Sequence, residues 1–272
     1  MHTRVELLAV GLSEEQGRGL MTEAEQEVKR LERLFNRFDS RSPLAVVNAT
    51  AVGQSVKVED ELFMALELCE VFRQATAGYF DVTAADAEVV CDGRGGYARD
   101  GKEHKVRLLR EGATIDLGGF AKGYAAESVR RLFEREGVAQ AVINFGNSSI
   151  VAMGHHPYGE WWPIGIELRK VKSAVAREVR LRDGAMSVSG RAESGEYHIV
   201  NPMTGDRAMG EELILVEGRS ALVAEVLSTA LYAAPRNKRN AIMAQYEGYV
   251  ATEIYCRADG STECREIGKM KR

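Results

Sequence analysis

The stretch TIDLGGFAKGYA at residues 114–125 contains residues suited to binding a phosphorylated ligand. Gly118 and Gly119 predict a turn in which the backbone can approach a ligand closely, and the helix that follows offers unpaired N–H groups at the positive end of its dipole. Lys122 lies in the first turn of that helix, where the dipole disfavours a cation, so a bound anion is the natural reason for it. A Gly-Gly turn before a helix is also ordinary turn chemistry, and this stretch alone leaves both readings open.

A carboxylate and a hydroxyl recur at helical spacing in ALVAEVLSTALY, residues 221–232. Glu225 and Thr229 are four residues apart, which places them on the same face of a helix. Mg²⁺ prefers oxygen ligands and takes few of them from the protein, which leaves room for phosphate and water. An exposed glutamate and a threonine bonded to its own helix would give the same pattern.

Histidine is the residue type in this sequence that suits proton transfer near neutral pH. His198 lies in a β-type run, and an imidazole that titrates near neutrality can accept a hydroxyl proton or hydrogen-bond a phosphate. A structural histidine is the alternative. His155 and His156 resemble a metal pair, but neighbours on an extended segment point in opposite directions, so we expect surface residues.

The hydrophobic pattern predicts an α+β protein, with strands in runs between helix pairs. Val5–Ala9 is expected to be a strand, and Ser13 with Gln16 forms a capping-box pattern for a helix that reaches Phe35. Residues 35–48 read as a structured loop, residues 62–72 as an amphipathic helix and residues 113–117 as a β-type run. A helix from Ala121 to about Glu136 follows. The other expected elements are strands at 138–144, 149–153, 161–167, 185–189, 197–200, 213–217 and 249–255, and helices at 220–232 and 236–246.

Composition excludes little beyond highly charged partners. The chain has 272 residues, of which 45% are hydrophobic and 28% charged, and its net charge of −4 gives no support for nucleic acid or an anionic membrane as a partner. The N-terminal residues show no signal peptide or membrane anchor, so we expect a cytoplasmic protein without membrane insertion. Four cysteines lack metal-ligand spacing. Cys256 and Cys264 could pair across a hairpin, although buried or free thiols are favoured over a disulfide.

Five stretches occur in the order typical of one family. They are SRSPLAVVN (40–48), TAGYFDVT (76–83), DLGGFAKGYA (116–125), YHIVNPMTG (197–205) and ALVAEVLSTALY (221–232). Together they resemble the ApbE family of FAD:protein FMN transferases over nearly the whole chain. The resemblance implies one α+β domain over residues 1–272, with a two-lobed arrangement of mixed and antiparallel sheets and packed helices. It also implies magnesium-dependent cleavage of FAD, attachment of FMN through a phosphoester to a threonine or serine of an acceptor flavoprotein, and release of AMP.

The resemblance also assigns roles to individual residues. It places Mg²⁺ on the Gly119 carbonyl, Glu225 and Thr229, sets Lys122 against the FAD phosphates and gives His198 the proton transfer. Asp116 is expected to fix the turn by accepting backbone N–H bonds. The positions implied to hold the nucleotide are Phe38, Ser42, Asn48, Thr76, Gly78, Phe80, Asp81, Asp116, Gly118, Lys122, Ser189, Gly190, His198 and Thr204.

Four departures from the family pattern concern oxygen-bearing side chains. The aspartate usual at the metal position is Glu225, a flavin-side tyrosine is Phe38, an aspartate before the proline is Asn201, and an acidic GGD is Gly146-Asn147-Ser148. One extra methylene at position 225 moves the carboxylate by about a bond length, and magnesium tolerates poor geometry badly. Two alternatives therefore stand beside the transferase: a flavin-binding carrier without turnover, and an FAD pyrophosphatase in which water replaces the acceptor hydroxyl.

Overall fold

A seven-stranded antiparallel sheet forms the centre of the computed structural model, which describes residues 3–84, 95–167, 175–190, 197–210, 212–257 and 261–268. Every neighbouring pair in it is antiparallel, including the pairing of the first strand with a strand more than 130 residues later, where Val5 lies opposite Phe145. The strands in spatial order are β1 (Val5–Ala9), β5 (Ala141–Phe145), β6 (Ser149–Met153), β9 (Gly184–Ser189), β10 (Leu213–Gly218), β11 (Val250–Cys256) and β12 (Thr262–Ile267).

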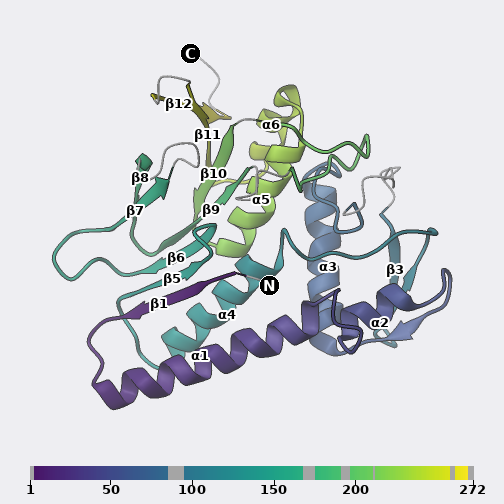
Figure 1. Ribbon diagram of the computed structural model, residues 1–272, viewed down its shortest axis with the longest axis horizontal. Coiled ribbons are helices and arrows are strands. Elements are labelled where there is room, and N and C mark those ends of the chain that lie inside the picture. The colour runs from purple at the N-terminus through teal and green to yellow at the C-terminus, as the bar shows by residue number, and fades with distance from the viewer. Residues whose placement is uncertain are drawn as a thin grey trace.

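Helices cover one face of this sheet and a hairpin covers the other (Figure 1). α4 (Ala121–Arg135) and α5 (Ala221–Ala233) contact the sheet directly, and α1 (Glu14–Phe35) packs on α4. Val151 and Ile214 belong to the clusters on the helical face. Ile150 and Leu215 instead pack with the hairpin of β7 (Trp162–Glu167) and β8 (Val175–Leu181). This alternation is the two-residue period of a sheet that is buried on both faces.

A second, smaller group of elements lies at the C-terminal end of α1 (Figure 1). It contains α2 (Pro43–Ala49), α3 (Asp60–Ala75) and a three-stranded sheet of β2 (Val56–Lys57), β4 (Lys105–Leu108) and β3 (Tyr97–Asp100). α6 (Arg236–Met243) follows α5 at the far end of the main sheet. The α+β class and the antiparallel main sheet confirm the sequence-based prediction, and the figure shows two groups of elements joined by α1.

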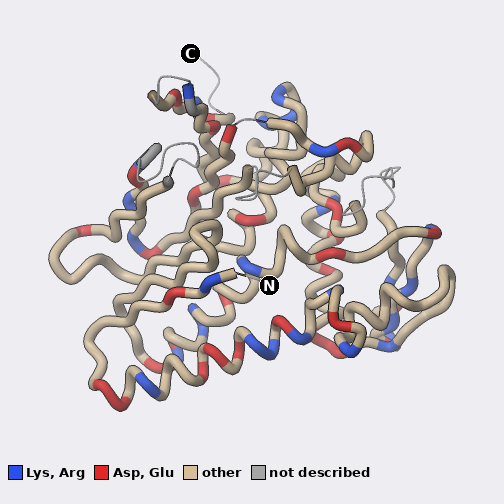
Figure 2. The backbone as a smooth tube through the Cα atoms, viewed as in Figure 1, with Lys and Arg blue, Asp and Glu red and all other residues tan. Residues whose placement is uncertain are grey.

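α1 illustrates how local sequence signals produce an element. Ser13 accepts a hydrogen bond from the Gln16 backbone, and the Gln16 side chain accepts one from Ser13, so the predicted capping box is present. Acidic and basic residues alternate along its outer surface (Figure 2), with ion pairs such as Arg18–Glu14 and Lys29–Glu25 at the i,i+4 spacing. The other face buries leucines and Phe35 against α4 and against the smaller group of elements, which we call the smaller lobe.

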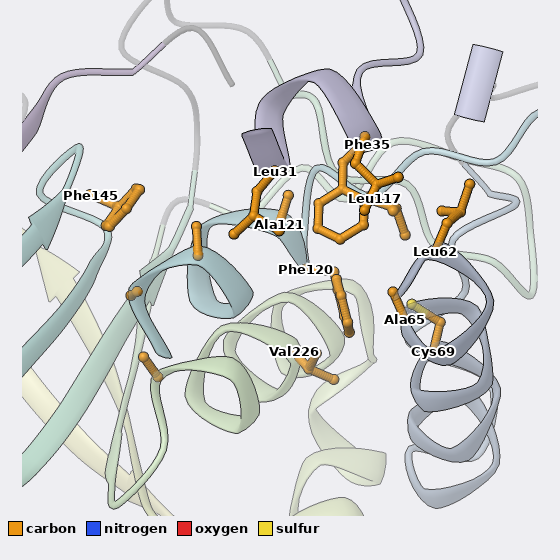
Figure 3. Close-up of a cluster of buried hydrophobic side chains, with 14 of the residues drawn as sticks. Leu31, Phe35, Leu62, Ala65, Cys69, Leu117, Phe120, Ala121, Phe145 and Val226 are labelled. Carbon is orange, nitrogen blue, oxygen red and sulfur yellow. The ribbon is translucent and has the colours of Figure 1, made fainter. Parts of the chain in front are cut away.

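The hydrophobic core continues from the sheet helices into the smaller lobe (Figure 3). Phe120 is fully buried and meets the ring of Phe35 edge-on, at 6.4 Å between centroids. Leu117 is 2% exposed, so buried side chains bracket the Gly118–Gly119 turn on both sides. The turn is therefore held by the core rather than left to the conformational freedom of its glycines.

The strands β2, β3, β4, β8 and β12 were not predicted from the sequence, and three predicted segments differ from the structure. Residues 113–117 form no strand, and the Asn48 side chain takes up the backbone hydrogen-bonding groups of Ile115 that a neighbouring strand would use. Its amide donates to the Ile115 carbonyl at 2.9 Å and accepts from the Ile115 N–H at 2.8 Å. The predicted 35–48 loop contains α2, and the predicted 197–200 strand is reduced to a bridge between Val200 and Arg207.

The structure describes free thiols at two of the four cysteines. Cys69 is a buried free thiol and Cys264 an exposed one. In the β11–β12 pairing, Cys264 lies opposite Ile254 and Cys256 lies opposite Thr262. The strand register therefore does not place the two cysteines opposite each other. Cys91 lies outside the described residues.

Within the described part of the chain, every helix is too short or too polar to cross a membrane.

Candidate functional site

A cavity of about 470 Å³ opens where the two lobes meet. Its lining combines the loop after α3, the glycine turn, the residue before β6, the end of β9, the 198–207 segment and α5. Residues separated by more than a hundred positions therefore share one space. Eleven of the sequence-predicted site residues line it: Phe80, Asp81, Asp116, Gly118, Gly119, Lys122, Ser189, Gly190, His198, Glu225 and Thr229.

Asp116 holds the glycine turn in the way the sequence suggested. Its Oδ1 accepts the N–H of Gly118 at 2.7 Å, and its Oδ2 lies 3.1 Å from Nε of Arg37. The Arg37 guanidinium also stacks over the Phe38 ring at 4.8 Å. The loop after α1 is thereby connected to the turn. Sequence reasoning did not select Arg37, because nothing in its neighbourhood distinguishes it from other arginines of the chain.

Gly119 lies directly against Thr229. A Cβ atom at position 119 would stand 3.1 Å from both Oγ1 and Cγ2 of Thr229, so glycine permits the close approach. The Thr229 hydroxyl is 3.4 Å from that of Ser189, which in turn is 2.8 Å from the Ser228 hydroxyl. A row of hydroxyl groups thus runs from the end of β9 to the backbone of the turn.

Glu225 is buried, with only 2% of its surface exposed, and three donors surround its carboxylate. The Lys122 ammonium pairs with Oε1, while Oε2 accepts from the Gly123 N–H and from the Ser149 hydroxyl, the latter at 2.8 Å. Helix α4 begins after Phe120, whose side chain cannot cap it. Glu225 therefore supplies, from another helix, the negative charge and the acceptor that this helix start lacks.

A side chain of α4 caps the start of α5 in the same way. Glu127 accepts the Ala221 N–H, in the first turn of α5, at 2.6 Å, so each helix caps the start of the other. The helices cross closely because Gly123 has no side chain. A Cβ atom there would lie 2.7 Å from the Ala221 carbonyl oxygen and 2.8 Å from Cα of Leu222. This crossing fixes the positions of Lys122 and Thr229 relative to each other.

His198 also lines the cavity and is exposed. The segment that carries it forms a loop that is closed by a β-bridge between Val200 and Arg207. Arg207 also donates a hydrogen bond to the Tyr197 carbonyl. An exposed imidazole that lines the same cavity as Lys122 and the row of hydroxyl groups can take a proton from a group bound there.

The remaining predicted residues lie outside the cavity lining in the described structure. Ser42 caps α2, Asn48 binds the Ile115 backbone, and Thr76 accepts the Phe80 N–H at 3.1 Å while it donates to Phe72. These three support neighbouring segments.

Phe38, Gly78 and Thr204 are also outside this lining. Phe38 is 75% exposed, and Thr204 is exposed and accepts the Asp206 N–H. Gly78 has φ of +84° and packs against Met203, so a side chain there would be strained. The HHPYG histidines are only partly exposed, and His155 lies 2.9 Å from the Gly159 carbonyl in its own loop.

Oxygen donors suited to a hard cation are present, although the described residues contain no group of three or more histidine, cysteine or acidic side chains placed for a metal. The Gly119 backbone, the Thr229 hydroxyl and Glu225 on the same helix all border the cavity. Magnesium commonly takes one or two carboxylates and completes its shell with substrate phosphates and water. The chemistry of this donor set fits magnesium that is shared with a phosphorylated ligand.

A glycine turn, a lysine at a helix start and a row of hydroxyl groups surround one cavity of this α+β protein, and such groups suit a phosphorylated ligand. The model of the ApbE family matches residues 1–252, and the chain belongs to this family. The FAD:protein FMN transferase of Treponema pallidum (strain Nichols) is 25% identical over 264 residues, which cover 81% of this chain and 72% of that protein. One from Klebsiella pneumoniae (strain 342) is 22% identical and covers 72% of this chain and 65% of its own length.

Solved structures agree with the fold. The flavin transferase ApbE from Vibrio cholerae superposes with a TM-score of 0.78 at 17% identity, covering 98% of this chain and 94% of that one. The flavinyl transferase ApbE of Pseudomonas stutzeri in its apo form also gives 0.78, at 20% identity, covering 97% and 95%. At these identities the likeness establishes the fold, and the chemistry has to be argued from the residues of this chain.

Proposed function

We propose that this protein is a magnesium-dependent FAD:protein FMN transferase, which cleaves FAD and attaches FMN to a threonine or serine of an acceptor protein. The observation that carries the proposal is that Lys122, His198, Thr229 and Glu225 line one cavity although they come from distant segments. Membership of the ApbE family and the names of the curated relatives support it.

The proposed reaction is a phosphoryl-type displacement. The acceptor hydroxyl oxygen forms a bond to the phosphorus of the FMN half, the bridging P–O bond breaks, and AMP leaves with the bridging oxygen. An imidazole nitrogen of His198 takes the hydroxyl proton. Lys122 places positive charge beside the diphosphate, and the row of Ser189 and Thr229 hydroxyls orients its oxygens. Such transfers depend on alignment and charge neutralisation more than on covalent help from the protein.

Magnesium is proposed to bind at the Gly119 carbonyl, Thr229 and Glu225. When bound, it would neutralise charge on the diphosphate. The nucleotide is proposed to occupy the cavity beside Phe80, Asp81, Asp116, Gly118 and Gly190, with Ser42, Asn48, Thr76 and Gly78 supporting the walls, and with Phe38 and Thr204 at the surface. The cytoplasmic location stays a prediction, which fractionation of cells and detection with an antibody would test.

The test measures AMP release from FAD in the presence of Mg²⁺, with and without an acceptor protein that carries a flavinylation threonine. Release only with the acceptor, together with a flavin-labelled acceptor, supports transfer. Release without the acceptor indicates the pyrophosphatase, and FAD binding without release indicates the carrier. We expect His198→Asn to lower the transfer rate by about 10²- to 10⁴-fold, the usual contribution of a general base.

The matched control is His104→Asn. His104 stacks on Phe63 and pairs with Asp60 on α3, and it does not belong to the cavity lining. Equal rates for the two variants and the unmodified protein would exclude His198 as the proton acceptor.

A further inference from the structure

Lys122 holds one oxygen of the carboxylate that the proposed metal would share with the Gly119 carbonyl and Thr229. Its ammonium pairs with Oε1 of Glu225 and lies 3.4 Å from the Gly118 carbonyl oxygen. A carboxylate together with a carbonyl of the glycine turn is the kind of oxygen set that a hard cation takes. In the free protein, the lysine therefore serves as the cation of this site.

The fixed charges of the cavity lining balance. Its carboxylates are Asp81, Asp116 and Glu225, and its permanent cations are Arg37, Lys122 and Arg207. The Asp116 carboxylate is already engaged by Arg37 and the Gly118 N–H. A divalent cation entering the free protein meets no net negative charge, and it has to take a buried carboxylate away from its ammonium partner, which is costly.

A diphosphate nucleotide changes both conditions. It adds negative charge to the cavity, and it offers Lys122 an alternative anionic partner. The lysine has a flexible four-carbon stem and its side chain is 23% exposed, so its ammonium can move. Glu225 would stay in place, because Oε2 remains bound by the Gly123 N–H and the Ser149 hydroxyl. Departure of Lys122 would thus leave Oε1 as an oriented, unoccupied oxygen.

We propose that Lys122 and the divalent cation compete for Glu225, and that a bound diphosphate resolves the competition by drawing Lys122 to itself. The cation then binds tightly only after the nucleotide. This inference rests on the proposed function, since it requires a diphosphate in the cavity. It adds an order of binding and gives Lys122 a second role, as the group that keeps the metal position closed in the free protein.

Binding of Mn²⁺ tests the order without any turnover. The electron paramagnetic resonance signal of free Mn²⁺, corrected for the Mn²⁺–ADP complex that forms without protein, gives the metal affinity, and ADP supplies a diphosphate that carries no FMN to transfer. We expect ADP to tighten Mn²⁺ binding by about 5- to 150-fold, the usual range of coupling between two ligands, and Mn²⁺ to tighten ADP binding by the same factor.

The Lys122→Met variant distinguishes competition for Glu225 from a simple change in the charge of the cavity lining. It should tighten Mn²⁺ binding to the free protein by a similar factor and reduce the further effect of ADP to the part that comes from phosphate oxygens bound to the metal. Arg207→Met is the matched control, since it also removes one positive charge from the lining but donates to the Tyr197 carbonyl rather than to Glu225. It should keep most of the ADP dependence. Lys122→Gln, a second neutral variant, covers the case in which the methionine variant does not fold.

Three results would overturn the inference. They are equal Mn²⁺ affinity of the unmodified protein with and without ADP, unchanged affinity in both folded lysine variants, and an equally large increase in Arg207→Met. Failure of the proposed function looks different, because FAD would then bind without transfer of FMN to the acceptor, while the Mn²⁺ and ADP measurements, which need no turnover, would be unaffected. The lysine variants are compared without nucleotide, so the competition is tested in that case as well.

Discussion

Two buried ionic clusters lie at opposite ends of the helices that follow β10, and they differ in how firmly the cation is held. At the cavity, Lys122 pairs with Glu225 and is 23% exposed. At the other end, Arg239 of α6 lies between Glu212 and Glu253, at 3.0 and 2.7 Å, with all three side chains no more than 6% exposed. Arg239 also donates to the Ala234 carbonyl at 3.1 Å.

The difference shows which buried charges are available for function. A guanidinium presents a rigid fork, so Arg239 satisfies three acceptors at once and cannot leave without stranding two carboxylates. The ammonium of Lys122 is a single point charge on a flexible stem, and the carboxylate it would leave keeps two other donors. The Arg239 cluster therefore fixes α6 on the sheet, whereas the Lys122 cluster can exchange its cation.

The largest expected effect breaks the fixed cluster. Arg239→Met leaves Glu212 and Glu253 buried without their cation, and we expect it to lower the free energy of unfolding by about 3–5 kcal/mol. Urea denaturation measures this change. Replacing both glutamates by glutamine in the same variant should recover much of the loss, because no buried charge then remains unpaired. A loss below 1 kcal/mol in Arg239→Met would contradict the assignment of this cluster to the scaffold.

The pH dependence of that loss has a defined sign. Burial acts to raise the pKa of Glu253, but hydrogen bonds from Tyr255 and Arg239 outweigh it and hold this pKa below its ordinary value. The stability that Glu253 contributes is thus complete above its unfolded pKa and is lost as the pH falls through the lower folded value. Without Arg239 this contribution is missing, so the stability difference between the two proteins should narrow as the pH is lowered below the ordinary glutamate range.

The second prediction breaks the exchangeable cluster. Lys122→Met should lower the rate of FMN transfer by about 10²- to 10³-fold, as expected when one charged donor to a transition state is removed. Its unfolding free energy should fall by only about 1–2 kcal/mol, since water reaches the partly exposed pair and Glu225 keeps its other hydrogen bonds. AMP-release kinetics and urea denaturation of the same preparation give both numbers. A stability loss as large as that of Arg239→Met would remove the distinction between the clusters.

Local signals predicted much of the scaffold. The Ser13–Gln16 capping box marked the start of α1, and the helices that carry Lys122 and Glu225 begin within one residue of their expected positions. α2 also had a readable signal, since Ser42 is its N-cap and Pro43 its first residue. That signal was missed because the segment lacks helical hydrophobic periodicity over a useful length.

Long-range partners were beyond the reach of such signals. The sequence placed Lys122, His198, Glu225 and Thr229 together only through resemblance to a family. It gave no indication that Glu225 would bind Ser149, 76 residues away, and the Gly123 backbone, 102 residues away. Likewise, Asn48 replaces a β-ladder partner for Ile115 through a side-chain amide, which no periodicity reveals. Both contacts depend on how distant elements cross, which periodicity and composition do not encode.

The third prediction disturbs the helix crossing that positions the exchangeable cluster. Gly123→Ala would bring Cβ within 2.8 Å of backbone atoms of Ala221 and Leu222, which cannot move as a flexible side chain would. We expect a loss of about 1–3 kcal/mol of stability, as for other overpacked positions. Gly19→Ala on α1 is the control, because its Cβ would meet nothing within 4 Å. That change should instead stabilise the protein by about 0.4–1 kcal/mol.

The smallest effect comes from shortening the shared carboxylate. Glu225→Asp moves the carboxylate back by about one carbon–carbon bond, so it cannot reach the Lys122 ammonium and the start of α4 together. Loss of one such hydrogen bond should cost about 1 kcal/mol of stability. With Lys122 released, Mn²⁺ binding to the ADP-free variant should tighten, and AMP release should rise relative to the unmodified protein if the longer glutamate limits turnover by holding the lysine. Mn²⁺ binding that stays as weak and as dependent on ADP as before would mean that the length of this side chain does not set the competition.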